Sequence, residues 1–225
     1  MTEPAWRQVK VWDGWVRLFH WAIVGLVGFS WWTQATDRMA WHIRSGYVIL
    51  ALMLFRLVWG VVGSDTARFR AFLRSPLRAF EHLRRLRRRE PDTEIGHNAA
   101  GGWMVLLLLA LLLLQAGTGL FANEEPGFDY GAQGPLAAWV AAPTSARLTG
   151  IHDLVFNLVL AAVALHVLAV LAYAVLKGQN LVRPMLTGTK RLPPTVPAPR
   201  LGSPVLAAAL LGTAALVVWG ISRLG

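Results

Sequence analysis

Long apolar runs are the feature of this sequence that most restricts its fold. Five segments are each long enough to cross the bilayer core, which takes about 20 mostly apolar residues per helix. They lie at about 16–35, 42–62, 100–122, 151–176 and 203–222. The hydrophobic share of 55% and the charged share of 15% exclude a water-soluble enzyme and a disordered chain. The sequence therefore predicts an all-α protein embedded in the lipid bilayer.

The positive charges predict how these spans are oriented. Three Lys or Arg precede or begin the first span, nine lie between the second and third, and five lie between the fourth and fifth. The opposite side carries only four. Since cytoplasmic loops are enriched in Lys and Arg, we expect a bacterial inner-membrane protein with a cytoplasmic N-terminus and a periplasmic C-terminus. The net charge of +10 thus reflects topology, and we expect no nucleic-acid partner.

Two segments outside the spans have a distinct character. In segment 75–89, Leu77, Phe80, Leu83 and Leu86 recur every three residues among many arginines. This spacing predicts a helix on the cytoplasmic membrane surface, with its arginines near anionic headgroups. Segment 191–202 is rich in proline and predicts a non-helical linker. It would separate a membrane domain at 1–190 from an extra transmembrane helix within 203–225.

Four histidines fall within or at the start of predicted spans, where ionisable side chains are rare and usually functional. His152 and His166 lie on one predicted helix, about 21 Å apart along its axis and within about 40° of the same face. In the predicted orientation, His20 is level with His166 and His42 is level with His152. Each pair can bracket one flat group, so the four predict two separate sites.

Neutral imidazole ligates haem iron well, and two stacked bis-histidine haems would carry electrons across the membrane. The chain has 0 cysteines, so disulfides, iron–sulfur clusters, zinc fingers and covalently attached c-type haem are excluded. Zinc is disfavoured because no HExxH motif is present and no carboxylate accompanies His166. Two other readings stay open: interfacial histidines that only form hydrogen bonds, and a proton or ion transporter with a histidine relay.

Four motifs carry a family resemblance: RLFHW, WHIRSGY, GHNAAGGW and IHDLVFN…ALHV. With them, the chain resembles the bacterial cytochrome b561 and nickel–iron-hydrogenase cytochrome b family over about residues 10–190. The resemblance implies a four-helix bundle with two b haems, which transfers electrons between a periplasmic redox partner and the quinone pool. By this resemblance, His20 and His166 hold the cytoplasmic-side haem, and His42 and His152 hold the periplasmic-side haem. The fifth helix lies outside the pattern and would pack on a partner or on the bundle.

The connection between the first two spans is shorter than in the hydrogenase subunits. Only about six residues, Thr36 to Trp41, separate these spans. The short connection favours the stand-alone members of the family, some of which oxidise superoxide and reduce quinone. The partner is then a small oxidant or reductant rather than a periplasmic redox protein, and the sequence leaves assembly with itself or with other subunits open.

Three arginines are candidates for pairing with haem propionates. Arg56 lies 14 residues after His42, on the same helix face and near the depth of the cytoplasmic-side histidines. The alternative for Arg56 is a side chain that reaches the nearby headgroups. Arg17 and Arg44 lie close to His20 and His42, and interfacial anchoring is the competing interpretation for both.

The remaining candidates lie in the loops. The resemblance implies quinone binding beside the loop that joins the second and third spans, which makes His97 and Asn98 candidate donors to a quinone carbonyl. Asn98 is equally suited to cap the third helix, and we expect His82 to be a solvated surface residue. The loop 123–150 carries three carboxylates against one arginine, which would favour a basic periplasmic partner. These residues are Glu124, Glu125, Asp129 and Arg147. The same charge balance is equally consistent with the depletion of positive charge that an external loop requires.

Overall fold

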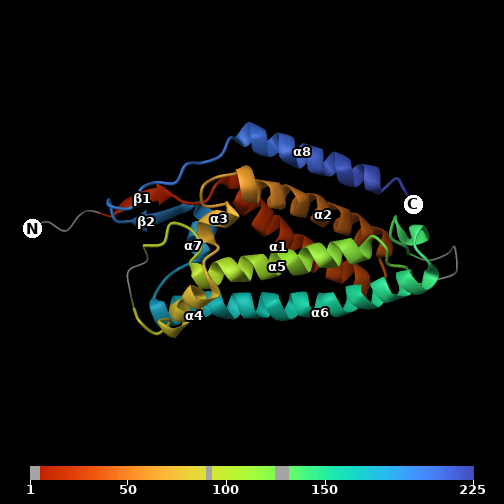
Figure 1. Ribbon diagram of the computed structural model, residues 1–225, viewed down its shortest axis with the longest axis horizontal. Coiled ribbons are helices and arrows are strands. Elements are labelled where there is room, and N and C mark those ends of the chain that lie inside the picture. The colour runs from red at the N-terminus through yellow and green to blue at the C-terminus, as the bar shows by residue number, and fades with distance from the viewer. Residues whose placement is uncertain (1–5, 90–92, 125–131) are drawn as a thin grey trace, which may run out of the picture. The chain divides into compact units, whose positions relative to one another are not determined.

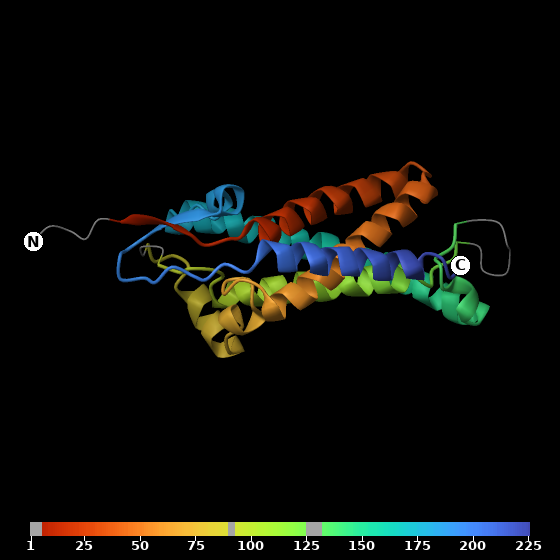
Figure 2. The ribbon, with the colours of Figure 1, turned by 90° about the horizontal axis from the view of Figure 1, so that it is seen from above.

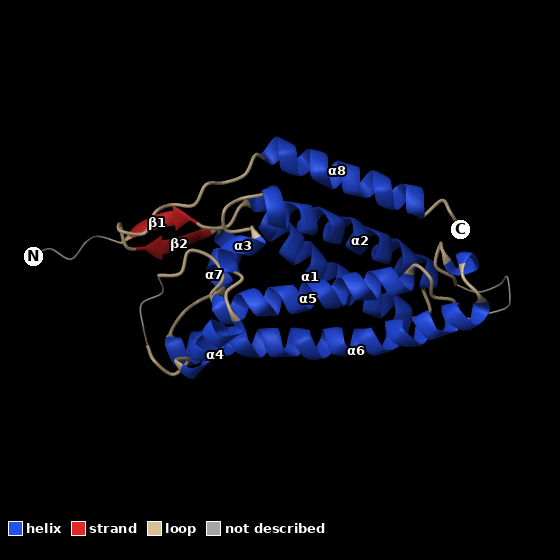
Figure 3. Ribbon diagram, in the orientation of Figure 1, coloured by secondary structure: helices blue, strands red, loops and turns tan. Residues whose placement is uncertain are grey.

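Helices make up most of the chain, as the apolar runs predict. The computed structural model describes residues 6–89, 93–124 and 132–225. Among these residues, one pair of short strands accompanies the helices (Figure 3). The prediction of an all-α membrane protein is thereby confirmed at the level of the fold class.

Five long helices coincide with the five predicted spans. They are α1 (Gly14–Ala35), α2 (Met39–Val62), α5 (Ala99–Gly119), α6 (Ala142–Ala172) and α8 (Pro204–Ile221). The shorter helices are α3 (Phe69–Phe72), α4 (Pro76–Arg84), the 3₁₀ turn η1 (Ala137–Trp139), the π-helical turn η2 (Tyr173–Lys177) and α7 (Val182–Thr187). The strands are β1 (Arg7–Lys10) and β2 (Thr189–Leu192). As the prolines predict, no helix is described between β2 and α8.

Four of the described helices are long and apolar enough to cross a membrane. They are α2, α5, α6 together with its π turn, and α8. The prediction of a first span at 16–35 is therefore not met on hydropathy, although the 22-residue helix α1 is present. The reason lies in its side chains, because Arg17, His20 and several tryptophans lower its mean hydropathy.

Side-chain caps set where several helices begin. The Asp13 carboxylate accepts a hydrogen bond from the Val16 amide at 2.7 Å, which caps α1. Ser75 caps α4 and Ser203 caps α8 in the same manner. Each of these serines precedes a proline at the first helical position, where the missing N–H costs no hydrogen bond.

The chain divides into two compact units, each built from three segments. The first unit comprises Met1–Leu18, Leu57–Leu107 and Ala162–Ala207, and the second comprises Phe19–Arg56, Leu108–Ala161 and Ala208–Gly225. The division predicted at residues 190 and 203 rests on the proline-rich linker rather than on compactness, and it stays a prediction.

The first unit holds the two strands and the short helices α3, α4, η2 and α7. β1 and β2 pair antiparallel, with Arg7 opposite Leu192 and Lys10 opposite Thr189 (Figure 1). The strand pair was not predicted from the sequence. Trp59 is fully buried in this unit, and its indole N–H donates to Asp13 at 3.2 Å. One residue thus both caps α1 and satisfies the buried indole.

The second unit holds a tight helical hairpin. α1 ends at Ala35 and α2 begins at Met39, and Figure 2 shows the short turn between them in red and orange. Asp37 adopts a left-handed conformation in this turn with φ of 57°, a geometry that ends a helix sharply. In the same unit, Val218 of α8 packs against Leu50 and Ala51 of α2.

Candidate functional site

His42 is held in the second unit by the end of α1. Its Nδ1 lies 2.9 Å from the backbone carbonyl of Ser30 and 3.1 Å from the Ser30 hydroxyl. A backbone carbonyl can only accept, so Nδ1 carries the proton in this arrangement. The other ring nitrogen, Nε2, is then an unprotonated donor atom of the kind that ligates a transition metal.

His152 is held in the same way by α5. Its Nδ1 lies 2.9 Å from the backbone carbonyl of Gln115 and 3.3 Å from the Thr118 hydroxyl. The helix geometry explains both contacts, because residues 115 and 118 are three apart and share one face of α5. Nε2 of His152 is again the nitrogen available to a metal.

The two imidazoles face each other across the second unit. Their ring centroids are 6.1 Å apart, and the ring planes are inclined by 82°. A metal bound by both Nε2 atoms would separate the centroids by about 6.2 Å, from about 2.0 Å per metal–nitrogen bond and about 1.1 Å from nitrogen to centroid. The observed centroid spacing is therefore the one that His42 and His152 would need if both held one metal ion.

A cavity of about 340 Å³ surrounds this histidine pair. Its apolar lining comes from α1, α2, α5 and α6, and includes Val27, Ile43, Ile49, Leu112 and Phe156. Two glycines leave room beside the imidazoles. A Cβ on Gly119 would lie 3.0 Å from Cε1 of His152, whereas a Cβ on Gly46, one turn after His42, would meet nothing within 4 Å. The cavity fits a flat apolar group held between the rings.

No third ligand completes a metal site of protein atoms alone. Across the residues that the structure describes, no group of three or more His, Asp or Glu is placed to hold a metal ion. Two imidazoles without further ligands fit a metal that brings its own equatorial ring, as haem iron does.

Gln115 also contacts the pair through its side chain. Its Nε2 lies 3.0 Å from Nε2 of His152, so the amide must turn aside before His152 ligates a metal. The amide oxygen of Gln115 is buried and accepts no hydrogen bond from the described residues. The side chain can therefore turn without losing an acceptor contact. Gln115 was not predicted from the sequence, because a glutamine within an apolar run carries no motif.

The structure does not bring the other two predicted ligands into one unit. His20 belongs to the second unit, where its ring packs edge-on against Trp21 at 4.8 Å. His166 belongs to the first unit, on the same helix α6 as His152. The pairing of His20 with His166 therefore stays a prediction.

The three predicted propionate partners lie in different surroundings. Arg56 is buried within α2, with 3% of its surface exposed. Arg17 donates to the carbonyl of Leu186 at 2.5 Å, near the end of α7. Arg44 is exposed and stacks over the Trp41 ring at 5.1 Å, the arrangement expected of an interfacial anchor.

His97 and Asn98 lie together in the first unit, before α5. The His97 ring packs between Trp12 at 4.7 Å and Phe72 at 4.9 Å. The Asn98 side-chain oxygen accepts from the Gly101 amide at 2.8 Å, which confirms that Asn98 caps α5. Its side-chain nitrogen donates to the Tyr173 hydroxyl at 3.0 Å, which leaves one amide N–H for another partner.

The prediction that His82 is a solvated surface residue is wrong. His82 is half-buried, its Nε2 lies 2.6 Å from the Tyr173 hydroxyl, and the two rings stack with centroids 6.0 Å apart. Tyr173 joins His82 to Asn98, two residues far apart in sequence. The arginines around His82 suggested a solvated face, and the aromatic partner comes from the distant η2 turn.

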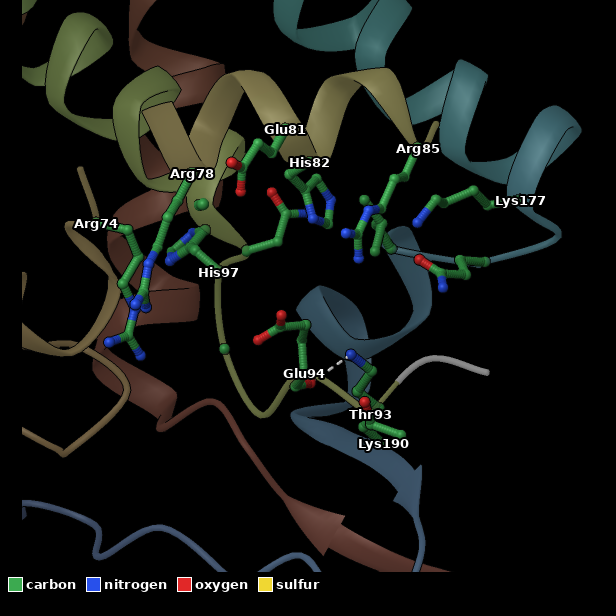
Figure 4. A pocket seen from close by; sticks show the side chains of 15 residues that line it. Arg74, Arg78, Glu81, His82, Arg85, Thr93, Glu94, His97, Lys177 and Lys190 are labelled. Atoms are coloured by element: carbon green, nitrogen blue, oxygen red, sulfur yellow. Dashed lines mark hydrogen bonds between the residues drawn. The ribbon is translucent and has the colours of Figure 1, made fainter. Parts of the chain in front are cut away.

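These side chains border a second cavity, of about 490 Å³, within the first unit (Figure 4). Five cationic side chains line it, together with two carboxylates and the His82, His97 and Asn98 side chains. The charged lining residues are Arg74, Arg78, Arg85, Lys177, Lys190, Glu81 and Glu94. This cavity differs sharply in charge from the one around the histidine pair.

Apolar helices of membrane length, together with two opposed imidazoles in an apolar cavity, define a membrane protein suited to hold haem. The chain matches the family model of prokaryotic cytochrome b561 over residues 11–188, and it belongs to that family. It is therefore a multi-pass membrane cytochrome of the b type that acts in electron transfer, with haem b as its cofactor. No curated protein and no solved structure gives a significant match.

Proposed function

We propose that this cytochrome carries two b haems and passes electrons between a periplasmic redox partner and membrane quinone. The observation that carries the proposal is the opposed pair of His42 and His152, whose Nδ1 atoms are both fixed by backbone carbonyls. When bound, the haem supplies an iron that gains and loses one electron. The chain keeps the imidazoles oriented and surrounds the group with apolar side chains, which tune its reduction potential.

The second haem is assigned to His20 and His166, and haem counting tests this. We expect two b haems per chain in a pyridine haemochrome assay of the purified protein. His166→Ala is expected to lower the count to one. Fewer than two haems in the unmodified chain would contradict the pairing, and a colourless protein would favour the transporter alternative.

Arg56, Arg17 and Arg44 stay candidate partners of the haem propionates. Arg56 is the strongest of the three because a buried guanidinium gains most from an anionic partner. Arg17 already donates to a backbone carbonyl, and Arg44 is exposed on a tryptophan ring.

Quinone is the proposed membrane-side partner, with His97 and Asn98 as donors to its carbonyl. The remaining N–H of the Asn98 amide and the half-buried His97 ring support this assignment. Asn98 also caps α5, so His97→Gln is the sharper test. We expect quinone reduction by the pre-reduced protein to slow in His97→Gln while the haem content is unchanged. Unchanged quinone kinetics would move the quinone site elsewhere.

The proposed location is the bacterial inner membrane, with α1 also crossing it and the N-terminus in the cytoplasm. α1 spans about 33 Å at the helical rise per residue, which suffices for the bilayer core despite its polar residues. The chain has 0 cysteines, so introduced thiols are labelled uniquely. An impermeant maleimide on intact spheroplasts is expected to label Thr36→Cys but not Gln8→Cys. If both variants or neither variant were labelled, residues 8 and 36 would lie on the same side of the membrane, which would contradict the proposed topology.

A stand-alone superoxide:quinone oxidoreductase is the second candidate. The observation that favours it is the short turn between α1 and α2, with only residues 36–38 outside the helices. The described flanks of the loop 123–150 also line the histidine cavity, through Asn123, Glu124 and Gln133. Glu125 and Asp129 lie outside the described residues. Superoxide-driven haem reduction by the isolated chain would support this candidate, and a requirement for a second protein would contradict it.

A further inference from the structure

Helix α4 has two chemically different faces. Leu77, Phe80 and Leu83 are exposed, with 66%, 59% and 50% of their surfaces free. On the opposite face, residues 78, 81, 82 and 85 follow helical spacing and line the basic cavity of the first unit. Large exposed apolar side chains beside arginines are typical of a helix lying in the membrane interface. The basic cavity then lies at the depth where lipid phosphates are found.

Four of the five cationic groups of this cavity form no ion pair with the described residues. In the described part of the chain, no carboxylate lies within 4.0 Å of the charged groups of Arg74, Arg78, Arg85 or Lys177. The fifth cation, Lys190, donates to the backbone carbonyl of Glu94 at 2.6 Å, as Figure 4 shows.

Among the five cationic side chains that line the cavity, Lys177 gives the clearest indication of a bound anion. It ends the π-helical turn η2, and only 6% of its surface is exposed. Its ammonium group lies 5.9 Å from the centre of the Tyr173 ring. A buried cation is costly unless an anion accompanies it. The described residues supply none within ion-pair distance, which favours an anion supplied by a ligand.

The arginine and lysine donors in the lining indicate which kind of anion the cavity would bind. Arg78 and Arg85, the C-cap of α4, are seven residues apart and therefore share one face of this helix. Figure 4 shows Arg78 on one side of the cavity and Arg85 beside Lys177 on the other. Arginine forks bind the oxygens of phosphate in pairs, while lysine adds a point charge. Thr93 and Gln179 add polar groups to the lining.

We propose that this cavity binds a phosphate-bearing anion, of the kind presented by the headgroup of an anionic lipid. Arg78, Arg85 and Lys177 hold the phosphate, and the exposed apolar face of α4 rests among the neighbouring acyl chains. The site goes beyond the proposed electron transfer and uses different atoms from the quinone donors His97 and Asn98.

Thermal stability of the delipidated holoprotein in neutral detergent tests the proposal. The probes are dihexanoyl phosphatidic acid, dihexanoyl phosphatidylcholine and inorganic phosphate, and the readout is Tm from tryptophan fluorescence. A ligand that binds only the folded state raises Tm with its concentration. We expect phosphatidic acid to raise Tm and phosphatidylcholine to leave it unchanged. An equal rise with inorganic phosphate would assign the site to a free anion rather than to a lipid.

Variants of equal charge separate a site from a general basic surface. Arg78→Gln/Arg85→Gln is expected to weaken phosphatidic acid binding at least ~10-fold, since each charge-assisted hydrogen bond contributes about 1.5–3 kcal/mol. Arg84→Gln/Arg87→Gln removes the same charge from residues outside the lining and is expected to bind normally. Lys177→Gln extends the test to the buried cation. Equal loss in the two arginine pairs, or no Tm rise in the unmodified protein, would overturn the proposal.

Discussion

The cavities of the two units contrast in charge and in construction. The cavity of the second unit is lined mainly from long helices, contains no Lys or Arg in its lining, and includes the carboxylates Glu124 and Asp153. The cavity of the first unit is lined by α4, the η2 turn, β2 and the loop before α5, and it carries five cations. Helices fix two imidazoles through backbone carbonyls, whereas turns gather charges from distant segments.

The contrast teaches what each construction is suited to bind. An apolar cavity stabilises a large planar group by burying its surface. The protein then has little charge on the bound group to neutralise. A cavity lined by an excess of cationic side chains attracts an anion, as basic segments beside a membrane attract anionic headgroups. Substitutions in one cavity should therefore leave the properties of the other unchanged.

The largest expected effect is loss of a cofactor. His152→Ala removes one of two axial ligands, and we expect the haem count per chain to fall by one while the protein stays folded. The pyridine haemochrome assay and circular dichroism measure the two quantities. His82→Ala is the matched control, because it removes a histidine from the basic cavity and should keep every haem. Equal haem loss in both variants would break the contrast between the cavities.

Gly119→Ala is expected to have the next largest effect. Its Cβ would lie 3.0 Å from Cε1 of His152, so the imidazole must tilt away from the carbonyl of Gln115. Loss of such an orienting contact typically weakens metal affinity by about 10–100-fold. Haem retention during competition with apomyoglobin measures this. Gly117→Ala on the same helix meets nothing within 4 Å and should behave as the unmodified protein. If the two variants lose haem alike, close contact at Gly119 does not position His152.

Gly202→Ala tests the core of the first unit. Its Cβ would lie 2.7 Å from the buried ring of Trp59, which is too close for either group to remain in place. Overpacking of this kind costs about 1–3 kcal/mol, so we expect a lower Tm with the haem spectrum unchanged. Gly212→Ala on α8 has open space at its Cβ and serves as the control. A normal Tm in Gly202→Ala would mean that the linker is not packed on Trp59.

The smallest expected effect concerns Asp65, outside the membrane spans. The Arg200 backbone amide donates to its carboxylate at 3.0 Å, and this contact, with the Arg200 and Arg68 charges, lowers the pKa of Asp65. A lowered pKa means that the contribution to stability is present above the unfolded pKa of about 3.9 and is lost as the pH falls through the folded value.

Exposed ion pairs contribute about 0.2–1 kcal/mol, so Asp65→Asn should lower Tm slightly at pH 7 and not below pH 3. The measurement is the difference in Tm between variant and unmodified protein across this pH range. Asp37→Asn, in the turn between α1 and α2, removes the same charge as a control. A Tm difference that persists at pH 3 would contradict the role of the Asp65 carboxylate.

The sequence predicts the long helices well because each carries a continuous apolar run of membrane length. Their ends depend on caps that are less visible. Asn98 was recognised as a possible cap, but α6 begins at Ala142, well before the apolar run at 151. The strand pair β1–β2 joins residues that are more than 170 positions apart, and two four-residue strands offer no periodic signal.

In the candidate site, too, some residues could be predicted from the sequence and others could not. His42 and His152 were predicted from their depths in the spans, since an ionisable group in an apolar run stands out. Tyr173 and Lys177 were missed because they end an apolar helix, where aromatic and basic residues are ordinary anchors. Their roles depend on the π turn, which no residue pattern in the sequence marks.

The packing of Gly202 connects the segment beyond the family match with the part of the chain that the match covers. The family match ends at residue 188, yet the segment beyond it covers Trp59, whose indole N–H binds the cap of α1. The amide of Gly202 also donates to the Ser64 hydroxyl at 2.8 Å. The segment after residue 188 thus covers Trp59, a residue inside the part of the chain that matches the family. A shortened protein that stops at residue 188 would expose Trp59.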